Sequence, residues 1–72
     1  MDIQKTLGKN VRRYREEKGW SQEDLAELSG LHRTYISGIE RGVRNPTTTV
    51  VLELALALQV QPSDLFKERV NE

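Results

Sequence analysis

Three polar residues near the middle of the chain offer the clearest chemistry in the sequence: Arg33, Thr34 and Ser37. Their spacing of three and four positions would place them on one face of a helix. A guanidinium can donate two hydrogen bonds to guanine O6 and N7, a threonine methyl can contact thymine, and a hydroxyl can bond a base edge. We predict that these side chains contact DNA bases; the alternative for Arg33 is a phosphate contact or a solvated side chain.

Other residues around this set carry donors that suit the phosphate backbone of DNA, which a protein contacts without reading the base sequence. The ring of Tyr35 can pack in the core or its hydroxyl can bond a phosphate, and His32 can cap a helix or contact a phosphate. Gln22 can serve simply as a helix former, and Arg13 as a solvated cation. The predicted phosphate contacts are Gln22, Arg13, His32, Tyr35, Arg41, Arg44 and Asn45.

Residues 21–42 predict two short helices joined by a tight turn, and this unit would position the polar set. Ser21 is a favourable N-cap for a helix over about residues 22–29, which Gly30 ends. Periodic apolar residues then predict a second helix over about residues 32–41.

Two features favour a helix-turn-helix over an ordinary helical hairpin. Ala26 is small enough to let two steeply crossing helices approach, and Gly30 can adopt the positive φ that the turn needs. Ile36 and Ile39 would then face inward toward Leu25, which leaves the polar set on the outside.

The run SQEDLAELSGLHRTYISGIERGVRNPT resembles the Cro/C1-type (phage-repressor-like, XRE) helix-turn-helix family of DNA-binding regulators. The likeness extends from about residue 7 to residue 66. Within that family, HRTYISGIERGVRNPT is most similar to the small controller proteins of restriction-modification systems. The residues in register with the family are Gln22, Leu25, Ala26, Gly30, Ile36, Glu40, Arg41, Gly42 and Pro46.

The resemblance implies an all-α, five-helix, lambda-repressor-like fold and a structural ion pair between Arg15 and Glu40. It also favours a phosphate contact for Gln22 over a purely helical role. Gly38 departs from the family, because some members carry a polar base-contacting residue there. Close approach of the helix to the DNA groove and tight packing against the first helix are two explanations for this glycine.

The flanking sequence predicts three more helices, over about residues 3–18, 48–59 and 62–70. The helix over 48–59 is so apolar that it has more than the stripe needed for a core. We therefore predict a homodimer interface in the region of about residues 50–70. The alternative places the leucines and the phenylalanine of this set in the internal core. The interface residues are Val50, Leu52, Leu56, Leu65 and Phe66.

The 72 residues fit one domain, residues 1–72, and contain no cysteine, so disulfides and thiolate metal sites are excluded. The sequence begins with no signal peptide and has no run long enough to span a membrane. Its single histidine makes a metal site improbable. We expect a cytoplasmic protein without cofactor, metal or small-molecule ligand.

Charge is distributed unevenly although the formal net charge is zero. Residues 1–45 hold nine Lys or Arg and seven Asp or Glu, a net of +2, and residues 46–72 hold two and four, a net of −2. A mildly basic front suits a protein that presents one face to a polyanion.

These features predict a sequence-specific transcriptional regulator that binds a palindromic operator in the DNA major groove as a homodimer. A restriction-modification controller that regulates its own expression is the more specific expectation. An enzyme is nearly excluded, because the sequence offers no nucleophile–base pair and no glycine-rich phosphate loop. The alternative is a protein-interaction module or an antitoxin with the same fold, for which the outer face of residues 32–41 would be apolar.

Overall fold

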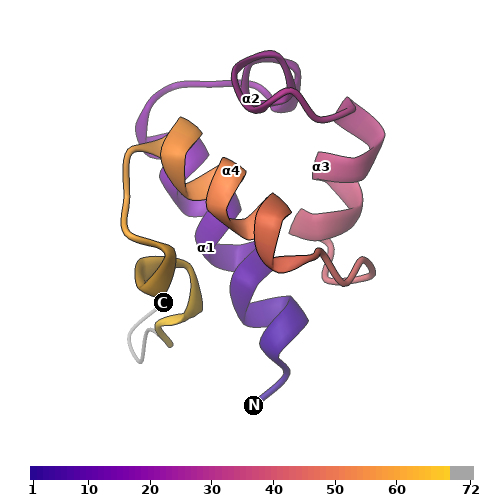
Figure 1. Ribbon diagram of the computed structural model, residues 1–72, viewed down its shortest axis with the longest axis vertical. Coiled ribbons are helices and arrows are strands. Elements are labelled where there is room, and N and C mark those ends of the chain that lie inside the picture. The colour runs from indigo at the N-terminus through magenta and orange to yellow at the C-terminus, as the bar shows by residue number, and fades with distance from the viewer. Residues whose placement is uncertain (69–72) are drawn as a thin grey trace.

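The computed structural model describes residues 1–68, which form four α-helices and a final 3-10 turn. Figure 1 shows α4 crossing in front of α1, with α2 and α3 beside them and the 3-10 turn η1 on the side of α1 away from α3. The prediction of an all-α fold is confirmed. The elements are α1 (Ile3–Glu17), α2 (Gln22–Ser29), α3 (Arg33–Glu40), α4 (Thr48–Leu58) and η1 (Pro62–Phe66).

Helices α1, α2 and α4 begin where the sequence supplies side-chain caps. The Asp2 carboxylate accepts hydrogen bonds from the first turn of α1, and the Thr47 hydroxyl accepts one from Val50 N. At α2, Ser21 Oγ accepts from Asp24 N, and the Asp24 carboxylate accepts from Ser21 N. These caps satisfy N–H groups that have no partner within the helix. The boundaries of all four α-helices, including α3, fall within two residues of those predicted.

The fifth helix, predicted over about residues 62–70, begins at Pro62 as predicted, but it is a 3-10 helix and shorter than expected. The 3-10 turn ends at Phe66, and the backbone is extended at Lys67. In this segment Asn10 Nδ2 donates to the carbonyl oxygens of Leu65 and Lys67, at 2.8 Å each, and so ties the extended backbone after η1 to α1. Residues 69 and 70 lie outside the described residues.

A single core collects apolar side chains from every element. Leu25, Ile36 and Ile39 are buried together, so the predicted contact between the inner faces of α2 and α3 is confirmed. Leu65 is fully buried in the same core, and its assignment to a dimer interface is therefore wrong. The buried apolar residues are Leu7, Val11, Leu25, Ile36, Ile39, Val51, Leu54, Ala55, Leu58 and Leu65.

Helix α1 approaches α3 closely at Gly8, a position that no sequence pattern indicated. A Cβ atom at this position would overlap the backbone carbonyl oxygens of Ile39 and Glu40. Because both obstacles are backbone atoms, no side-chain rearrangement can make room for it. Gly8 therefore fixes the distance at which α3 is held against α1.

Candidate nucleic-acid interface

The turn between α2 and α3 has the geometry that the helix-turn-helix interpretation requires. Gly30 adopts φ +77°, and its N–H donates to the carbonyl of Ala26 at 2.9 Å. His32 occupies the N-cap position of α3, but its side chain makes no capping hydrogen bond. The capping role considered for His32 is wrong, and its exposed ring stays a predicted phosphate contact.

The outer face of α3 carries the predicted base-contacting residues. Arg33 and Thr34 are exposed, Ser37 is half-buried, and Ile36 and Ile39 occupy the opposite, buried side. Helical spacing thus separates a polar face from an apolar one within eight residues, because residues three and four apart share a face. The three side chains are together at the surface, and their contacts with bases remain a prediction.

Arg33 is held in place only weakly. Its Nε lies 4.0 Å from Glu23 Oε1, and the two side chains are 53% and 80% exposed. An exposed pair at this distance stabilises a protein by about 1 kcal/mol at most. The guanidinium of Arg33 is therefore free to exchange its partner for a ligand. One turn further on, Arg41 Nε donates to Ser37 Oγ at 3.3 Å.

Beneath this face, the ion pair that the resemblance implied is present. Arg15 Nε donates to Glu40 Oε2 at 2.7 Å and Arg15 Nη2 to Glu40 Oε1 at 2.9 Å, while Nη1 donates to the carbonyl of Trp20. The hydrogen bond to Glu40 raises the pKa of Arg15, so the buried guanidinium stays charged. This bidentate pair ties the end of α3 to α1 and makes both residues part of the scaffold.

Gln22 shares the same carboxylate. Its Nε2 donates to Glu40 Oε1 at 3.1 Å, which links the first residue of α2 to the last residue of α3. A terminal amide has a second N–H, so this bond and a phosphate contact are compatible. The phosphate contact of Gln22 stays a prediction.

The assignment of Arg13 to DNA phosphate has to be corrected. Its Nη2 donates to Asn10 Oδ1 at 2.8 Å, and its guanidinium lies 4.7 Å from the centre of the Tyr14 ring. Two positions apart on a helix of 3.6 residues per turn, Arg13 and Arg15 point to opposite sides. Since Arg15 contacts α3, Arg13 lies on the side of α1 that holds η1, where it supports the Asn10 hydrogen bonds.

The loop after α3 places two more predicted phosphate contacts at the surface, Arg44 and Asn45. The guanidinium carbon of Arg44 lies 5.6 Å from the centre of the Tyr35 ring. Tyr35 is half-buried and packs against the core, so the packing role considered for its ring is present. A hydrogen bond from its hydroxyl to a phosphate remains a prediction.

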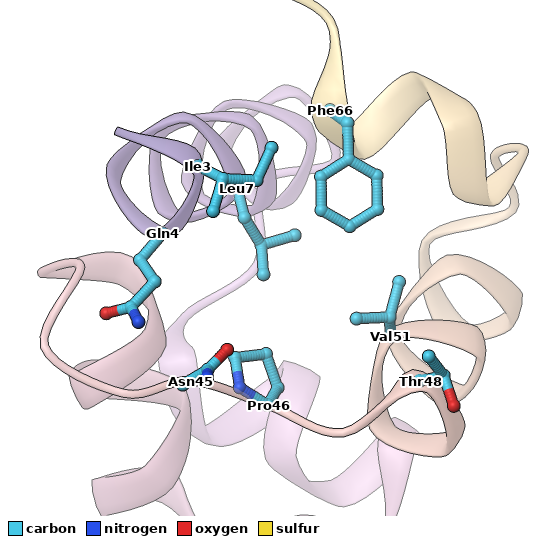
Figure 2. A pocket seen from close by; sticks show the side chains of 8 residues that line it. All are labelled: Ile3, Gln4, Leu7, Asn45, Pro46, Thr48, Val51 and Phe66. Carbon is cyan, nitrogen blue, oxygen red and sulfur yellow. The ribbon is translucent and has the colours of Figure 1, made fainter. Parts of the chain in front are cut away.

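A shallow hollow lies between the start of α1, the loop after α3 and the start of α4 (Figure 2). None of the side chains that line it is charged, and Ile3, Leu7, Val51 and Phe66 face its interior. The full lining is Ile3, Gln4, Leu7, Asn45, Pro46, Thr48, Val51 and Phe66. The charged residues of the candidate interface lie outside this hollow.

The outer side of α4 retains part of the predicted dimer surface. Leu52 and Leu56, one turn apart, are 48% and 68% exposed. Val50 and Phe66 are half-buried and pack against the core, so they can contribute only their outer edges. With Leu65 excluded, Leu52 and Leu56 form the centre of any apolar interface on this side.

No helix within residues 1–68 is long and apolar enough to cross a membrane. No group of three or more His, Cys, Asp or Glu side chains in this part of the chain is arranged to hold a metal ion.

The chain is similar in sequence and in structure to known helix-turn-helix proteins. The helix-turn-helix family model HTH_3 matches residues 11–65. Control protein C.SmaI of Serratia marcescens is 55% identical over 66 residues, which cover 92% of this chain and 79% of that protein.

Solved structures of two similar proteins share the fold. The restriction-modification controller protein C.AhdI from Aeromonas hydrophila is 48% identical, with a TM-score of 0.85 over 88% of this chain and 96% of that one. A tetramer of the restriction-modification controller protein C.Esp1396I has been solved in complex with its natural 35-base-pair operator. That protein is 41% identical, with a TM-score of 0.81 over 89% of this chain and 84% of its own.

Proposed function

We propose that this protein, which belongs to the helix-turn-helix family HTH_3, is a sequence-specific DNA-binding transcriptional regulator. The sequence of residues 21–47 predicts membership of a helix-turn-helix family. The observation that carries the proposal is the outer face of α3, where Arg33 and Thr34 are exposed and polar above a buried apolar side. A protein-interaction module would instead be expected to expose apolar residues on this face.

In the proposed complex, the N-terminal end of α3 enters the major groove. Arg33 donates to guanine, and Thr34 and Ser37 contact neighbouring base edges. The N-terminus of α2, with Gln22, faces a phosphate, because its free N–H groups and the helix dipole favour an anion. His32, Arg41, Arg44 and Asn45 supply further backbone contacts that fix the position of α3 in the groove.

The regulator acts as a homodimer on a palindromic operator in this proposal. The exposed pair Leu52 and Leu56 on α4 supports a two-fold interface, in which the same patch of each subunit meets its copy. A two-fold dimer would set the two copies of α3 about 34 Å apart, one turn of DNA. The operator-bound tetramer of C.Esp1396I supports binding by more than one subunit.

We further propose that the protein is a restriction-modification controller that regulates its own expression. The 55% identity to C.SmaI over most of both chains supports this assignment. In such a system the amount of dimer, set by protein concentration, would determine operator occupancy without a small-molecule ligand. A dimer that stays intact far below its working concentration would contradict this mode of control.

The experiment that tests DNA recognition is selection of bound duplexes from a random pool at low salt, followed by sequencing. Wild type is compared with Arg33→Ala and with Lys67→Ala as control. Lys67 also carries one positive charge, but it follows η1, which lies on the side of α1 away from α3 (Figure 1). We expect a palindromic consensus for wild type and Lys67→Ala, and loss of preference at one position per half-site for Arg33→Ala. Failure of every protein to enrich a sequence would overturn the proposal and favour a protein-interaction role.

The dimer is tested separately by sedimentation. Leu52→Glu together with Leu56→Glu is expected to yield monomers, because the charges would have to be desolvated at the interface. Leu28→Glu is the matched control, since Leu28 is 58% exposed on α2 and lies outside the proposed interface. Dimers that persist in the double variant would exclude α4 as the dimer surface.

A further inference from the structure

We propose that Gly38 positions Arg44: because Gly38 has no side chain, the Arg44 side chain can pack directly against the backbone of α3. This inference rests on the proposed DNA-binding function. Gly38 is the third-last residue of α3 and lies within its last turn, where glycine is still less favourable for a helix than alanine. Its presence therefore needs a cause outside the helix itself. The surroundings of position 38 supply one.

The backbone after α3 returns the chain over the helix. Gly42 adopts φ +75°, its N–H donates to the carbonyl of Ile39, and Val43 N–H donates to the carbonyl of Gly38. This pair of hydrogen bonds, with a left-handed residue just past the helix end, is a Schellman motif. It reverses the chain direction so that residue 44 comes to lie beside position 38.

The space that a side chain would fill at position 38 is occupied by Arg44. A Cβ atom built on Gly38 would lie 2.5 Å from Arg44 Cγ, 3.4 Å from Nε and 3.5 Å from Cδ. All three of its nearest neighbours therefore belong to this one side chain. Packing against the first helix, one of the two explanations considered from the sequence, is wrong, because α1 approaches α3 at Gly8 instead.

A second contact fixes the far end of the Arg44 side chain. Tyr35 precedes Gly38 by three positions on α3, so the two share an edge of the helix. The Arg44 guanidinium lies 5.6 Å from the centre of the Tyr35 ring, within the range of a cation–π contact. The stem is thus held by Gly38 and the head by Tyr35, while the residue as a whole stays exposed.

Restricting Arg44 before binding matters because long side chains lose rotamer freedom when they are immobilised at an interface. An arginine already confined along the edge of α3 loses less freedom when it contacts DNA. Gly38→Ala would improve the helix while displacing Arg44 from this position. We therefore expect a variant with at least wild-type thermal stability that binds its operator less well.

The test is a double-mutant cycle on operator affinity, with Gly38→Ala made in wild type and in Arg44→Ala. The probe is the consensus duplex obtained by the selection described above. We expect Gly38→Ala to weaken binding by about three- to thirtyfold in wild type, which lies within the range of directly interacting pairs, and to have no effect in Arg44→Ala. Equal losses in both backgrounds would indicate close approach of α3 to the groove and overturn the proposal. So would the absence of a loss in either background.

A measurement on the free protein keeps this inference separate from the proposed function. The Tyr35 ring should shift the NMR signals of the Arg44 side-chain protons in wild type, and Gly38→Ala or Tyr35→Leu should remove that shift. If Gly38→Ala leaves the Arg44 signals unchanged, the proposed packing of Arg44 against Gly38 is wrong, whether or not the protein binds DNA. If no operator can be selected, the proposed function fails, and the NMR comparison alone decides how Arg44 is held.

Discussion

Arg15 and Arg33 each face a glutamate from another helix, but the two pairs have opposite surroundings. The Arg15–Glu40 pair is joined at 2.7 Å, with side chains only 10% and 4% exposed. The Arg33–Glu23 pair is separated by 4.0 Å, with side chains 53% and 80% exposed. The same residue types thus serve the scaffold at one place and the candidate binding surface at the other.

The difference follows from solvation. A buried charge has given up its water and depends on its partner, whereas an exposed charge retains water and exchanges partners at little cost. Arg15 therefore cannot leave Glu40 to contact a ligand, while Arg33 can leave Glu23. Substitutions at Glu40, Arg33 and Glu23 test this distinction. A substitution at Asp64 tests a third ion pair, at η1.

The largest effect is expected for Glu40→Ala. Removing the carboxylate leaves the Arg15 guanidinium buried and unpaired, which should lower the free energy of unfolding by about 3–5 kcal/mol. Urea denaturation measures the change. Replacing both partners by Arg15→Met and Glu40→Leu should cost less than Glu40→Ala alone, since no charge is then left buried. A double variant less stable than the single one would contradict this account of the pair.

Arg33→Ala is expected to affect binding and not stability. The free energy of unfolding should change by less than about 0.5 kcal/mol, as for most surface substitutions. Discrimination of the operator against a duplex changed at the contacted guanine should fall by about 1–3 kcal/mol. Titrations with both duplexes, beside wild type, measure the effect. A loss of equal size on every duplex would assign Arg33 to a phosphate instead of a base.

Glu23→Gln tests the exposed Arg33–Glu23 pair by removing the charge of its acidic residue. This change releases Arg33 and removes a negative charge near the proposed DNA surface, so operator affinity should rise, by about fivefold at most. Stability should stay within about 0.5 kcal/mol of wild type. A fluorescence anisotropy titration of the operator duplex at fixed salt concentration measures the change in affinity. Weaker binding by Glu23→Gln would mean that Glu23 orients Arg33 for its contact.

The smallest effect concerns acid stability at η1. Hydrogen bonds from the Lys67 ammonium and from Gln61 N lower the pKa of Asp64 below its ordinary value of 3.8. A carboxyl whose pKa is lower in the folded state stabilises the fold above the unfolded pKa, and this stability is lost as pH falls through the folded pKa. Between about pH 5 and about pH 2, the melting temperature of wild type should therefore fall slightly more than that of Asp64→Asn. Parallel curves would show that Asp64 contributes nothing to the acid response.

The helix-turn-helix was predictable because its signals are local. The cap at Ser21 and the break at Gly30 act within a few residues, and the apolar period of α3 separates Ile36 and Ile39 from the polar face within one helix. Local hydrogen bonds and helix geometry are enough to infer such features from sequence. The Arg15–Glu40 pair, which joins residues 25 positions apart, was expected only through the family resemblance.

The errors arose where contacts join distant parts of the chain. Asn10 binds the carbonyl of Leu65, 55 positions away, and no local pattern signals this contact. Arg13 donates to Asn10 only three positions away, but its location beside η1 follows from the distant Asn10–Leu65 contact, which the local spacing does not indicate. Leu65 was placed at a dimer surface because periodicity alone does not distinguish an internal core from an interface between subunits.

The close approach of α1 to α3 at Gly8 has a consequence for genetics. Every substitution there would push α3 away from α1, so a mutational scan scored by reporter-gene regulation should find position 8 as intolerant as position 33. Intolerance at Arg33 would report a lost contact, whereas at Gly8 it would report a displaced helix. The set of positions at which substitutions inactivate the protein would therefore include residues that do not contact DNA. Only protein abundance, measured for the same variants, would separate the two groups.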